Sequence, residues 1–316
     1  MTDQRLPVTI AVPTFHRPEE LRVLLPLLKA QADDLDAAGT TTTDVLVVDN
    51  DPGASGRTAA EEAGVRYVVE PQPGIAAARN RALDESTGSR LLAFIDDDEH
   101  PHAGWLRELV RVWRISEPAL VSGRVVAEFE RPPGRWIEEG RFFVRRSLPT
   151  GTPLHVAAAG NLLLDLDQVR ESGVRFALDL GLSGGEDTLF SRQLAHAGYR
   201  MVWCNESVIT DLVPSARISR SWVLRRAWSH GNSTAVVSVR LASGPAGRAV
   251  ARVRAAVGGA ARVVLGVART ALGLLLRSPG HQARGSRAAY RGAGMVWAAF
   301  GGVYQEYART TQGTPQ

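Results

Sequence analysis

The chain has 316 residues, of which 44% are hydrophobic and 22% are charged, and this composition excludes a disordered or collagen-like polymer. Its single cysteine, Cys204, excludes an internal disulfide framework and any multi-cysteine metal site. The sequence has no signal-like apolar segment before the first strand-like run and no stretch of 18 uncharged apolar residues, so we expect a cytoplasmic protein.

Charge is distributed unevenly along the chain. The formal net charge of +4 combines a net of −10 over residues 1–213 with a net of +14 over residues 214–316. The second region holds 15 arginines and one acidic residue, Glu306. Such a basic region predicts an anionic partner, either lipid headgroups or nucleic acid.

The first hundred residues alternate between strand-like and helix-like patterns. Short apolar runs rich in β-branched residues predict buried parallel strands over residues 8–12, 44–48, 65–69 and 91–95. Helical patterns lie between them, over residues 19–29, 57–63 and 76–83. This alternation predicts an open sheet flanked by helices. Pro13-Thr14-Phe15 follows the first predicted strand where a dinucleotide-binding fold would carry Gly-x-Gly-x-x-Gly, which disfavours that fold.

The next hundred residues give a mixed pattern. We expect helices over residues 105–115 and 187–197, and strands over residues 120–129 and 154–164. A loop rich in Pro, Gly and Arg, residues 131–151, separates these two strands. From residue 217 onward the chain is predicted to be mainly helical. We therefore expect an α/β domain over residues 1–213 and a helical, Arg-rich extension over residues 214–316.

An acidic run follows the fourth predicted strand. Residues 96–99 read Asp-Asp-Asp-Glu directly after an apolar segment, which places carboxylates at the carboxyl edge of the sheet, where open α/β folds bind ligands. In extended geometry Asp96 and Asp98 would share one face and could bind one hard cation. A solvated acidic turn is the alternative, and the buried strand before it favours metal binding.

Another pair of acids, Glu186-Asp187, begins a predicted helix after a Gly-Gly turn. A carboxylate at this position could be directed into a cleft and act as a general base. It could equally stabilise the helix dipole, which is worth about 0.3–1 kcal/mol. The pair alone does not separate these two interpretations.

Taken in order, several short motifs resemble those of the family 2 glycosyltransferases of GT-A fold. The motifs are Val12-Pro13-Thr14-Phe15-His16-Arg17, Val47-Val48-Asp49-Asn50, Gly74-Ile75-Ala76-Ala77-Ala78-Arg79-Asn80, Phe94-Ile95-Asp96-Asp97-Asp98 and Gly184-Gly185-Glu186-Asp187. Each motif alone is weak, but their order makes the match specific, and it covers about residues 7–232. The resemblance implies a GT-A mixed sheet, a nucleotide-sugar donor (UDP-sugar favoured), a Mn²⁺ or Mg²⁺ ion on the Asp-x-Asp motif, and inversion at the anomeric carbon.

The resemblance also assigns roles to residues of the donor half, residues 1–100. Pro13, Thr14 and Arg17 would border the nucleoside, and Asp49 would accept a hydrogen bond from the base. Gly74 would let the backbone approach the donor, while Arg79 and Asn80 would face the ribose and diphosphate.

The metal and the acceptor half, residues 101–213, receive their roles in the same way. Asp96 would lie near the ribose or the metal, and Asp98 would ligate the metal directly. Asp187 would be the catalytic base. Glu186 and Asn161, the latter in a Gly160-Asn161 motif, would lie at the acceptor site.

One position departs from the family pattern. Where relatives often place a metal-binding His before Val-Pro, this chain has Asp211, which is still a competent oxygen ligand. His230 is the rival for that third position, and we rank it below Asp211. Arg217 would approach the diphosphate. The chain lacks the Gln-x-x-Arg-Trp signature of processive relatives, which favours transfer of a single sugar to a glycan, lipid-linked or small-molecule acceptor.

The basic region has its own periodicity. At about 100° per residue, Arg248, Arg252, Arg262, Arg269 and Arg277 share one arc, with valine, alanine and leucine side chains opposite. This pattern predicts a helix lying in the plane of an anionic membrane surface, with Gly258-Gly259 and Gly266 as candidate breaks. A helix packed on the catalytic domain is the alternative. No aromatic-interleaved basic stripe supports nucleic-acid binding.

We therefore expect an inverting, metal-dependent glycosyltransferase that is cytoplasmic and peripheral on the inner face of the cell membrane. It would act in the biosynthesis of a cell-surface glycan or a glycosylated metabolite. Two alternatives stay open. A sugar-phosphate nucleotidyltransferase would need a Gly-rich, basic loop after the first strand, which Pro13-Thr14-Phe15 does not provide. A non-catalytic lipid- or nucleic-acid-binding protein would not need the acids Asp96, Asp98 and Asp187.

Overall fold

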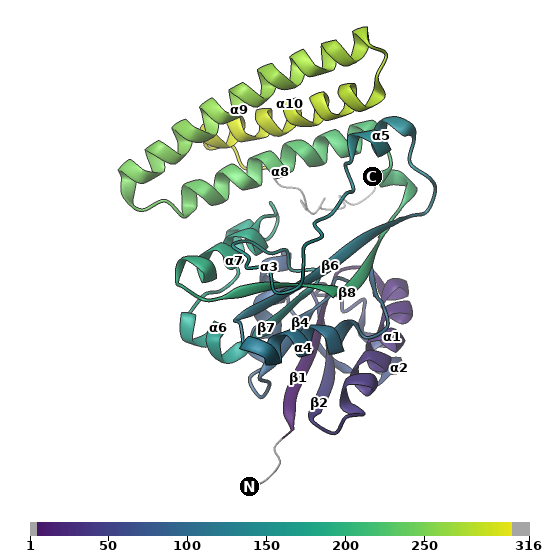
Figure 1. Cartoon of the computed structure of the whole chain (residues 1–316). Coiled ribbons are helices and arrows are strands. Elements are labelled where there is room, and N and C mark those ends of the chain that lie inside the picture. The colour runs from purple at the N-terminus through teal and green to yellow at the C-terminus, as the bar shows by residue number, and fades with distance from the viewer. Residues whose placement is uncertain (1–4, 305–316) are drawn as a thin grey trace, which may run out of the picture. The chain divides into compact units, whose positions relative to one another are not determined.

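The computed structural model describes residues 5–304 (Figure 1). The chain forms two compact units that are interleaved in sequence. The first comprises residues 1–132, 143–177 and 187–215, and the second comprises residues 133–142, 178–186 and 216–316. The second unit thus includes two short segments that lie within the predicted α/β region, residues 133–142 and 178–186.

The first unit is built on one eight-stranded mixed sheet, with strand order β3-β2-β1-β4-β7-β6-β8-β5. The strands are β1 (Leu6–Thr14), β2 (Thr41–Asp49), β3 (Arg66–Val69), β4 (Leu91–Phe94), β5 (Glu99–Pro101), β6 (Leu120–Phe129), β7 (Leu162–Asp165) and β8 (Met201–Val213). Strands β3, β2, β1 and β4 pair in parallel, whereas β7 is antiparallel to both β4 and β6. The four parallel strands predicted from the sequence are confirmed.

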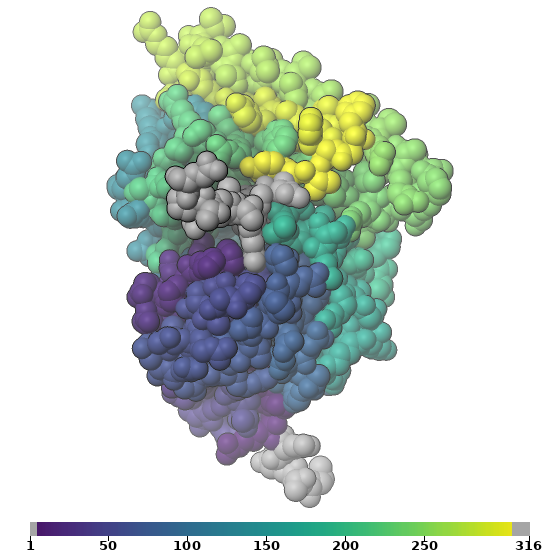
Figure 2. All heavy atoms as spheres, turned by 180° about the vertical axis from the view of Figure 1, so that it is seen from behind, coloured from purple at the N-terminus to yellow at the C-terminus, as the bar shows by residue number. Residues whose placement is uncertain are grey.

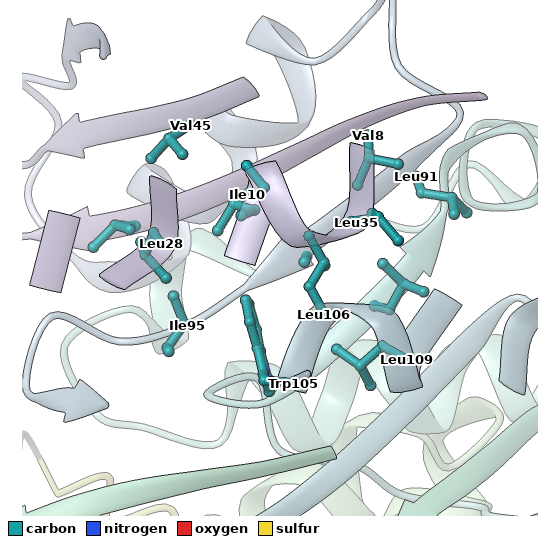
Figure 3. Packing of buried hydrophobic residues seen from close by; sticks show 14 of the residues in the cluster. Val8, Ile10, Leu28, Leu35, Val45, Leu91, Ile95, Trp105, Leu106 and Leu109 are labelled. Atoms are coloured by element: carbon teal, nitrogen blue, oxygen red, sulfur yellow. The ribbon is translucent and has the colours of Figure 1, made fainter. Parts of the chain in front are cut away.

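Helices cover both faces of this sheet (Figure 1). They are α1 (Pro18–Asp36), α2 (Arg57–Ala63), α3 (Ile75–Glu85), α4 (Trp105–Ser116), α6 (Leu166–Ser172) and α7 (Glu186–His196), whose first residue belongs to the second unit. Because successive strand residues point to opposite faces, β1 contributes Val8, Ile10 and Val12 to one core and Ala11 to the other. The first core packs against α1 and α4, and Trp105 is fully buried in it (Figure 3).

One predicted strand is largely absent. Of residues 154–164, only the end forms a strand, β7, and residues 154–161 are irregular. Backbone groups there bond elsewhere: the Ala157 N–H donates to Ser191 Oγ at 3.1 Å. The apolar composition of this segment reflects burial between elements, and burial alone does not distinguish a strand from a packed loop.

The second unit is helical. Its elements are α5 (Arg135–Gly140), α8 (Arg220–Arg240), α9 (Gly244–Leu275) and α10 (Pro279–Ala299), with short 3₁₀ turns at Leu178–Leu180 and Ser215–Arg217, the latter beginning in the first unit. Its core uses small side chains, among them Ala235, Ala255 and Ala298. Asn232 on α8 ties the unit together, donating to the Gly302 carbonyl at 2.9 Å and accepting from the Tyr304 N–H at 3.0 Å. The mainly helical extension is confirmed.

Candidate active site

The candidate site lies where parallel strands β1, β2 and β4 end. Thr14 at the end of β1 pairs in register with Asp49 at the end of β2, and β4 leads into the acidic residues 96–99. Since the carboxyl ends of neighbouring parallel strands meet at one edge of a sheet, the motifs predicted to bind the donor share that edge.

The acidic run forms a turn rather than an extended segment. The Glu99 N–H donates to the Asp96 carbonyl at 3.2 Å, and the Glu99 carboxylate accepts from the Asp96 N–H at 3.1 Å. Asp97 and Asp98 occupy the turn between these two residues. The expectation that Asp96 and Asp98 share a face through strand geometry is therefore wrong, because strand β4 ends at Phe94.

Arg17 joins this acidic turn to the end of β1. Its Nη1 lies 2.6 Å from Asp97 Oδ1 and 2.9 Å from Asp98 Oδ2. The Thr14 hydroxyl donates to Asp97 Oδ2 at 2.8 Å. Burial raises the pKa of Asp97 to about 6, although Arg17 and Thr14 act in the opposite direction. Two predicted donor-site residues, Thr14 and Arg17, are thus brought together by Asp97, which the sequence analysis left without a role.

Arg79 contacts the same turn from helix α3. This helix starts after Gly74, whose φ of +117° lies in a region that side chains other than glycine rarely adopt. The buried guanidinium of Arg79 places Nη2 at 3.2 Å from Asp96 Oδ1. Desolvation raises the pKa of Asp96, the charge of Arg79 lowers it, and the charges of Asp98 and Asp187 raise it further. Asp187 on α7 is thus close enough to Asp96 for its charge to act on that carboxyl. Its role as the base stays a prediction.

Two of the predicted donor-site residues are engaged by the chain itself. The Asn80 side chain donates to the Phe176 carbonyl at 2.8 Å and accepts from its N–H at 3.0 Å. Asp49 is fully buried and accepts from the N–H groups of Asp51 and Gly56 and from the Tyr67 hydroxyl. In this structure Asn80 fixes the segment around Phe176, and Asp49 fixes the loop after β2. Their contacts with a donor stay predictions.

Asn161 also has structural partners. Its Oδ1 accepts from Trp105 Nε1 at 2.9 Å, and its Nδ2 donates to the carbonyls of Arg124 and Ser207 at 3.0 and 3.1 Å. The residue is buried, so these three bonds use the side chain within the first unit. Its predicted role at the acceptor site is not tested by this arrangement.

Asp211 lies opposite Glu99, where β8 pairs with β5. Its Oδ2 accepts from Arg145 Nη2 at 2.6 Å. Burial raises the pKa of Glu99 well above its usual range, and the charges of Asp96, Asp98 and Asp211 add to this effect. No role was predicted for Glu99, the fourth acid of the run, and no sequence pattern singled out Arg145. Nothing in the residues around Arg145 distinguishes it from the other arginines of its loop.

The three predicted metal ligands do not form one ligand group. Over residues 5–304, no cluster of three or more His, Cys, Asp or Glu side chains is placed to hold a metal ion. Arg17 pairs with Asp98, and Arg145 pairs with Asp211. Asp96 and Asp98 nonetheless present hard oxygen donors on one turn, with 36% and 26% of their side chains exposed. This donor chemistry fits Mg²⁺ or Mn²⁺ with other ligands from phosphate and water.

Pro13 is the last but one residue of β1 in the first unit. Three other predicted residues belong to the second unit. Glu186 is buried at the start of α7, and the Arg217 guanidinium lies 6.0 Å from the centre of the Trp222 ring. His230, the rival of Asp211, is on α8. Their roles stay predictions.

Comparison with known proteins identifies the family. The model of Glycosyl transferase family 2 matches residues 9–171. The succinoglycan biosynthesis protein ExoM of Rhizobium meliloti (strain 1021) is 33% identical over 241 residues, 74% of this chain and 75% of ExoM. Glycosyltransferase AglE of Haloferax volcanii is 27% identical over 209 residues, 64% of this chain and 65% of AglE. The chain belongs to glycosyltransferase family 2, and it is a glycosyltransferase acting on nucleotide-sugar donors.

Solved structures confirm the fold. The crystal structure of S. aureus TarS 1-349 aligns with a TM-score of 0.54 at 14% identity, covering 78% of this chain and 68% of that chain. Its complex with UDP-GlcNAc aligns with a TM-score of 0.51 at 15% identity, covering 90% of each chain. GalNAc-T7 with UDP, GalNAc and Mn²⁺ aligns with a TM-score of 0.51 at 12% identity, covering 76% of this chain and 52% of that one. The sheet is the GT-A mixed sheet that the motifs implied.

Proposed function

We propose that this glycosyltransferase transfers one sugar from a UDP-sugar to an acceptor hydroxyl with inversion of the anomeric carbon, assisted by a divalent cation. The observation that carries the proposal is the relation between Asp187 and the acidic turn. The charge of Asp187 acts on Asp96, which lies on the turn that follows β4 at the carboxyl edge of the sheet. A candidate base and candidate diphosphate-side carboxylates therefore occupy one locality.

In the proposed reaction, Asp187 accepts the proton of the acceptor hydroxyl. The acceptor oxygen then forms a bond to the anomeric carbon, while the bond from that carbon to the diphosphate oxygen breaks and its electron pair leaves with the diphosphate. Because the new bond forms on the face opposite the departing group, the configuration inverts. Arg145 and Asp211 lie near the acidic turn. They form an ion pair, and Asp211 on β8 is paired with Glu99 on β5, the residue that follows Asp98.

The nucleotide-sugar donor would bind at the acidic turn. Asp96 and Asp98 would hold Mg²⁺ or Mn²⁺, and such an ion neutralises negative charge that accumulates on the leaving diphosphate. Arg17 and Arg79 contact these carboxylates and hold them in position. The preference for UDP is supported by the resemblance and by two structural neighbours, whose complexes contain UDP-GlcNAc or UDP with Mn²⁺.

The acceptor is proposed only as a chemical class, a carbohydrate hydroxyl. A relative named for succinoglycan biosynthesis supports a carbohydrate acceptor, whether free, part of a glycan or lipid-linked. We propose action in the cytoplasm at the inner face of the cell membrane.

Product analysis tests this proposal. Purified full-length protein would be incubated with Mn²⁺, a panel of UDP-α-sugars and simple sugar acceptors, and the product followed by proton NMR. We expect a β-anomer from an α-linked donor. An α-product would contradict inversion, and turnover with GDP-sugars but not UDP-sugars would contradict the donor preference.

A further inference from the structure

Helix α9 of the second unit has two chemically distinct faces. It runs without interruption for 32 residues, so the glycines expected as breaks do not break it. At about 100° per residue, every side chain over one half of its circumference is alanine, valine, leucine or proline. We call this half the outer face of α9; its larger members include Val250, Val253, Val257, Val264, Val267 and Leu275.

The opposite side of α9 packs against α10. Gly259, Gly266 and Gly273 recur every seven residues and are buried. A Cβ on Gly259 would lie 2.7 Å from the Gly292 carbonyl oxygen, and one on Gly266 would lie 2.5 Å from the Ala289 nitrogen. Such close backbone approach is typical of helix pairs joined by small residues. Figure 1 shows the two helices running side by side, and Figure 2 shows their surfaces adjoining each other.

This packing leaves the outer face uncovered. Val257, Val264 and Leu275 are 65%, 67% and 82% exposed. A continuous aliphatic surface along a whole helix is unusual for a surface in water and indicates contact with a partner or a membrane.

Charge indicates which of these covers it. Helix α9 carries five arginines and α10 carries three, and neither contains an acidic residue. Two copies meeting through the outer face would bring two such helix pairs together and add like-charge repulsion. An anionic bilayer can bury the aliphatic side chains and also attract the positively charged arginines.

Length and composition also make α9 the one helix among residues 5–304 that could cross a membrane. A spanning orientation would bury Arg262 and Arg269 in hydrocarbon, where arginine is strongly disfavoured. Helix α10, fixed along the glycine side of α9, would bring its own arginines with it. An in-plane orientation avoids both costs, because it leaves the arginines at headgroup level.

We propose that the outer face of α9 binds an anionic phospholipid bilayer, with the helix lying in the plane of the headgroup and acyl boundary. The apolar side chains enter the boundary region, and Arg252 and Arg254, which border the outer face of α9, extend toward lipid phosphates. This inference rests on the second unit alone and does not depend on the proposed transfer reaction.

Vesicle co-sedimentation of the full-length protein tests the proposal. The probes are vesicles of phosphatidylcholine alone and of phosphatidylcholine mixed with phosphatidylglycerol. The variant V257Q/V264Q adds amides to the outer face without changing charge. V23Q/I115Q is the matched control, because Val23 and Ile115 are 55% and 70% exposed on the first unit. Thermal unfolding of both variants checks that each is folded.

We expect the wild type and the control to bind the mixed vesicles equally, and V257Q/V264Q to bind about tenfold or more weakly. Binding should fall as NaCl rises and be weak on phosphatidylcholine alone. Equal binding by wild type and V257Q/V264Q would overturn the proposal, as would no vesicle binding by the wild type. Sedimentation velocity without lipid provides the other arm. A wild-type dimer that V257Q/V264Q converts to a monomer would assign the face to a second copy and overturn the membrane assignment.

Discussion

The guanidinium of Arg145 lies 2.6 Å from the carboxylate of Asp211, the acid that stands where the family resemblance predicts a metal-binding histidine. The Arg145 side chain is 42% exposed and the Asp211 side chain is 13% exposed, so the less exposed carboxylate holds the more exposed guanidinium in position. A cation must compete with the arginine for such a carboxylate. Asp98 also pairs with an arginine, Arg17, but at 2.9 Å and with 26% of its side chain exposed, so Asp211 is the less available ligand of the two.

Asp211 is therefore expected to contribute little to cation affinity. Asp211→Asn should change Mn²⁺ affinity, measured by calorimetry in the presence of UDP, by less than about threefold. Asp98→Asn should lower it by about tenfold or more, because a direct ligand is removed. Equal losses in the two variants would restore Asp211 as a ligand.

The role of Asp187 can be separated from donor binding. Asp187→Asn keeps the shape of the side chain but cannot accept the proton, so kcat should fall by roughly 10²–10⁴-fold while the KM for the donor changes little. Asp167→Asn is the matched control, since Asp167 also lies in the first turn of a helix, α6, and should leave kcat unchanged. A large rise in donor KM in the Asp187 variant would instead assign Asp187 to donor or metal binding.

Asp97 makes the stability of the metal-free protein depend on pH. Burial raises its pKa from 3.8 to about 6 in the folded state, so the unfolded chain releases this proton at lower pH. The buried carboxyl of Asp97 therefore lowers the unfolding free energy as the pH rises from about 4 to about 6. Above about pH 6 this loss of stability is complete. Relative to wild type, Asp97→Asn should gain about 2 kcal/mol in unfolding free energy between pH 4 and pH 8.

Urea unfolding in EDTA at several pH values measures this difference. Using the difference between variant and wild type reduces the contributions of Glu99 and Asp96, because both proteins carry these two acids. A difference that stays constant from pH 4 to pH 8 would show that Asp97 does not titrate with a raised pKa.

The Asn161 network predicts a stability effect. Asn161→Ala leaves the Trp105 N–H and the carbonyls of Arg124 and Ser207 without this partner in a buried region. We expect a loss of about 2–4 kcal/mol in unfolding free energy, since each buried unsatisfied group costs about 1–3 kcal/mol. Asn205→Ala, which removes an exposed bond to Ser147, should cost less than about 1 kcal/mol. Equal effects would indicate that the Asn161 bonds are not important for stability.

The parts of the fold that the sequence predicted are those determined locally. Short apolar runs at β1, β2 and β4, flanked by helical patterns, indicate buried parallel strands, and the ends of these strands bring the motifs to one edge. The geometry of the acidic turn was missed because it depends on the side chain of Glu99 bonding back to the Asp96 N–H. The Arg145–Asp211 pair joins positions 66 residues apart, and no local pattern encodes it.

The helical unit shows the same limit. Its periodicity predicted one arginine face and one apolar face on α9, and both are present. Periodicity did not show which face would be covered. The glycines at 259, 266 and 273 decide this, because they let α10 approach the backbone closely on the arginine side.

Release of UDP from UDP-sugars tests the central claim most directly. With Mn²⁺ and sugar acceptors, the wild type should release UDP from at least one UDP-sugar, and EDTA or Asp98→Asn should abolish the release. Asp187→Asn should release UDP at least a hundredfold more slowly while still binding it. Release at the wild-type rate in EDTA and in both variants would contradict a reaction carried by the acidic turn and Asp187.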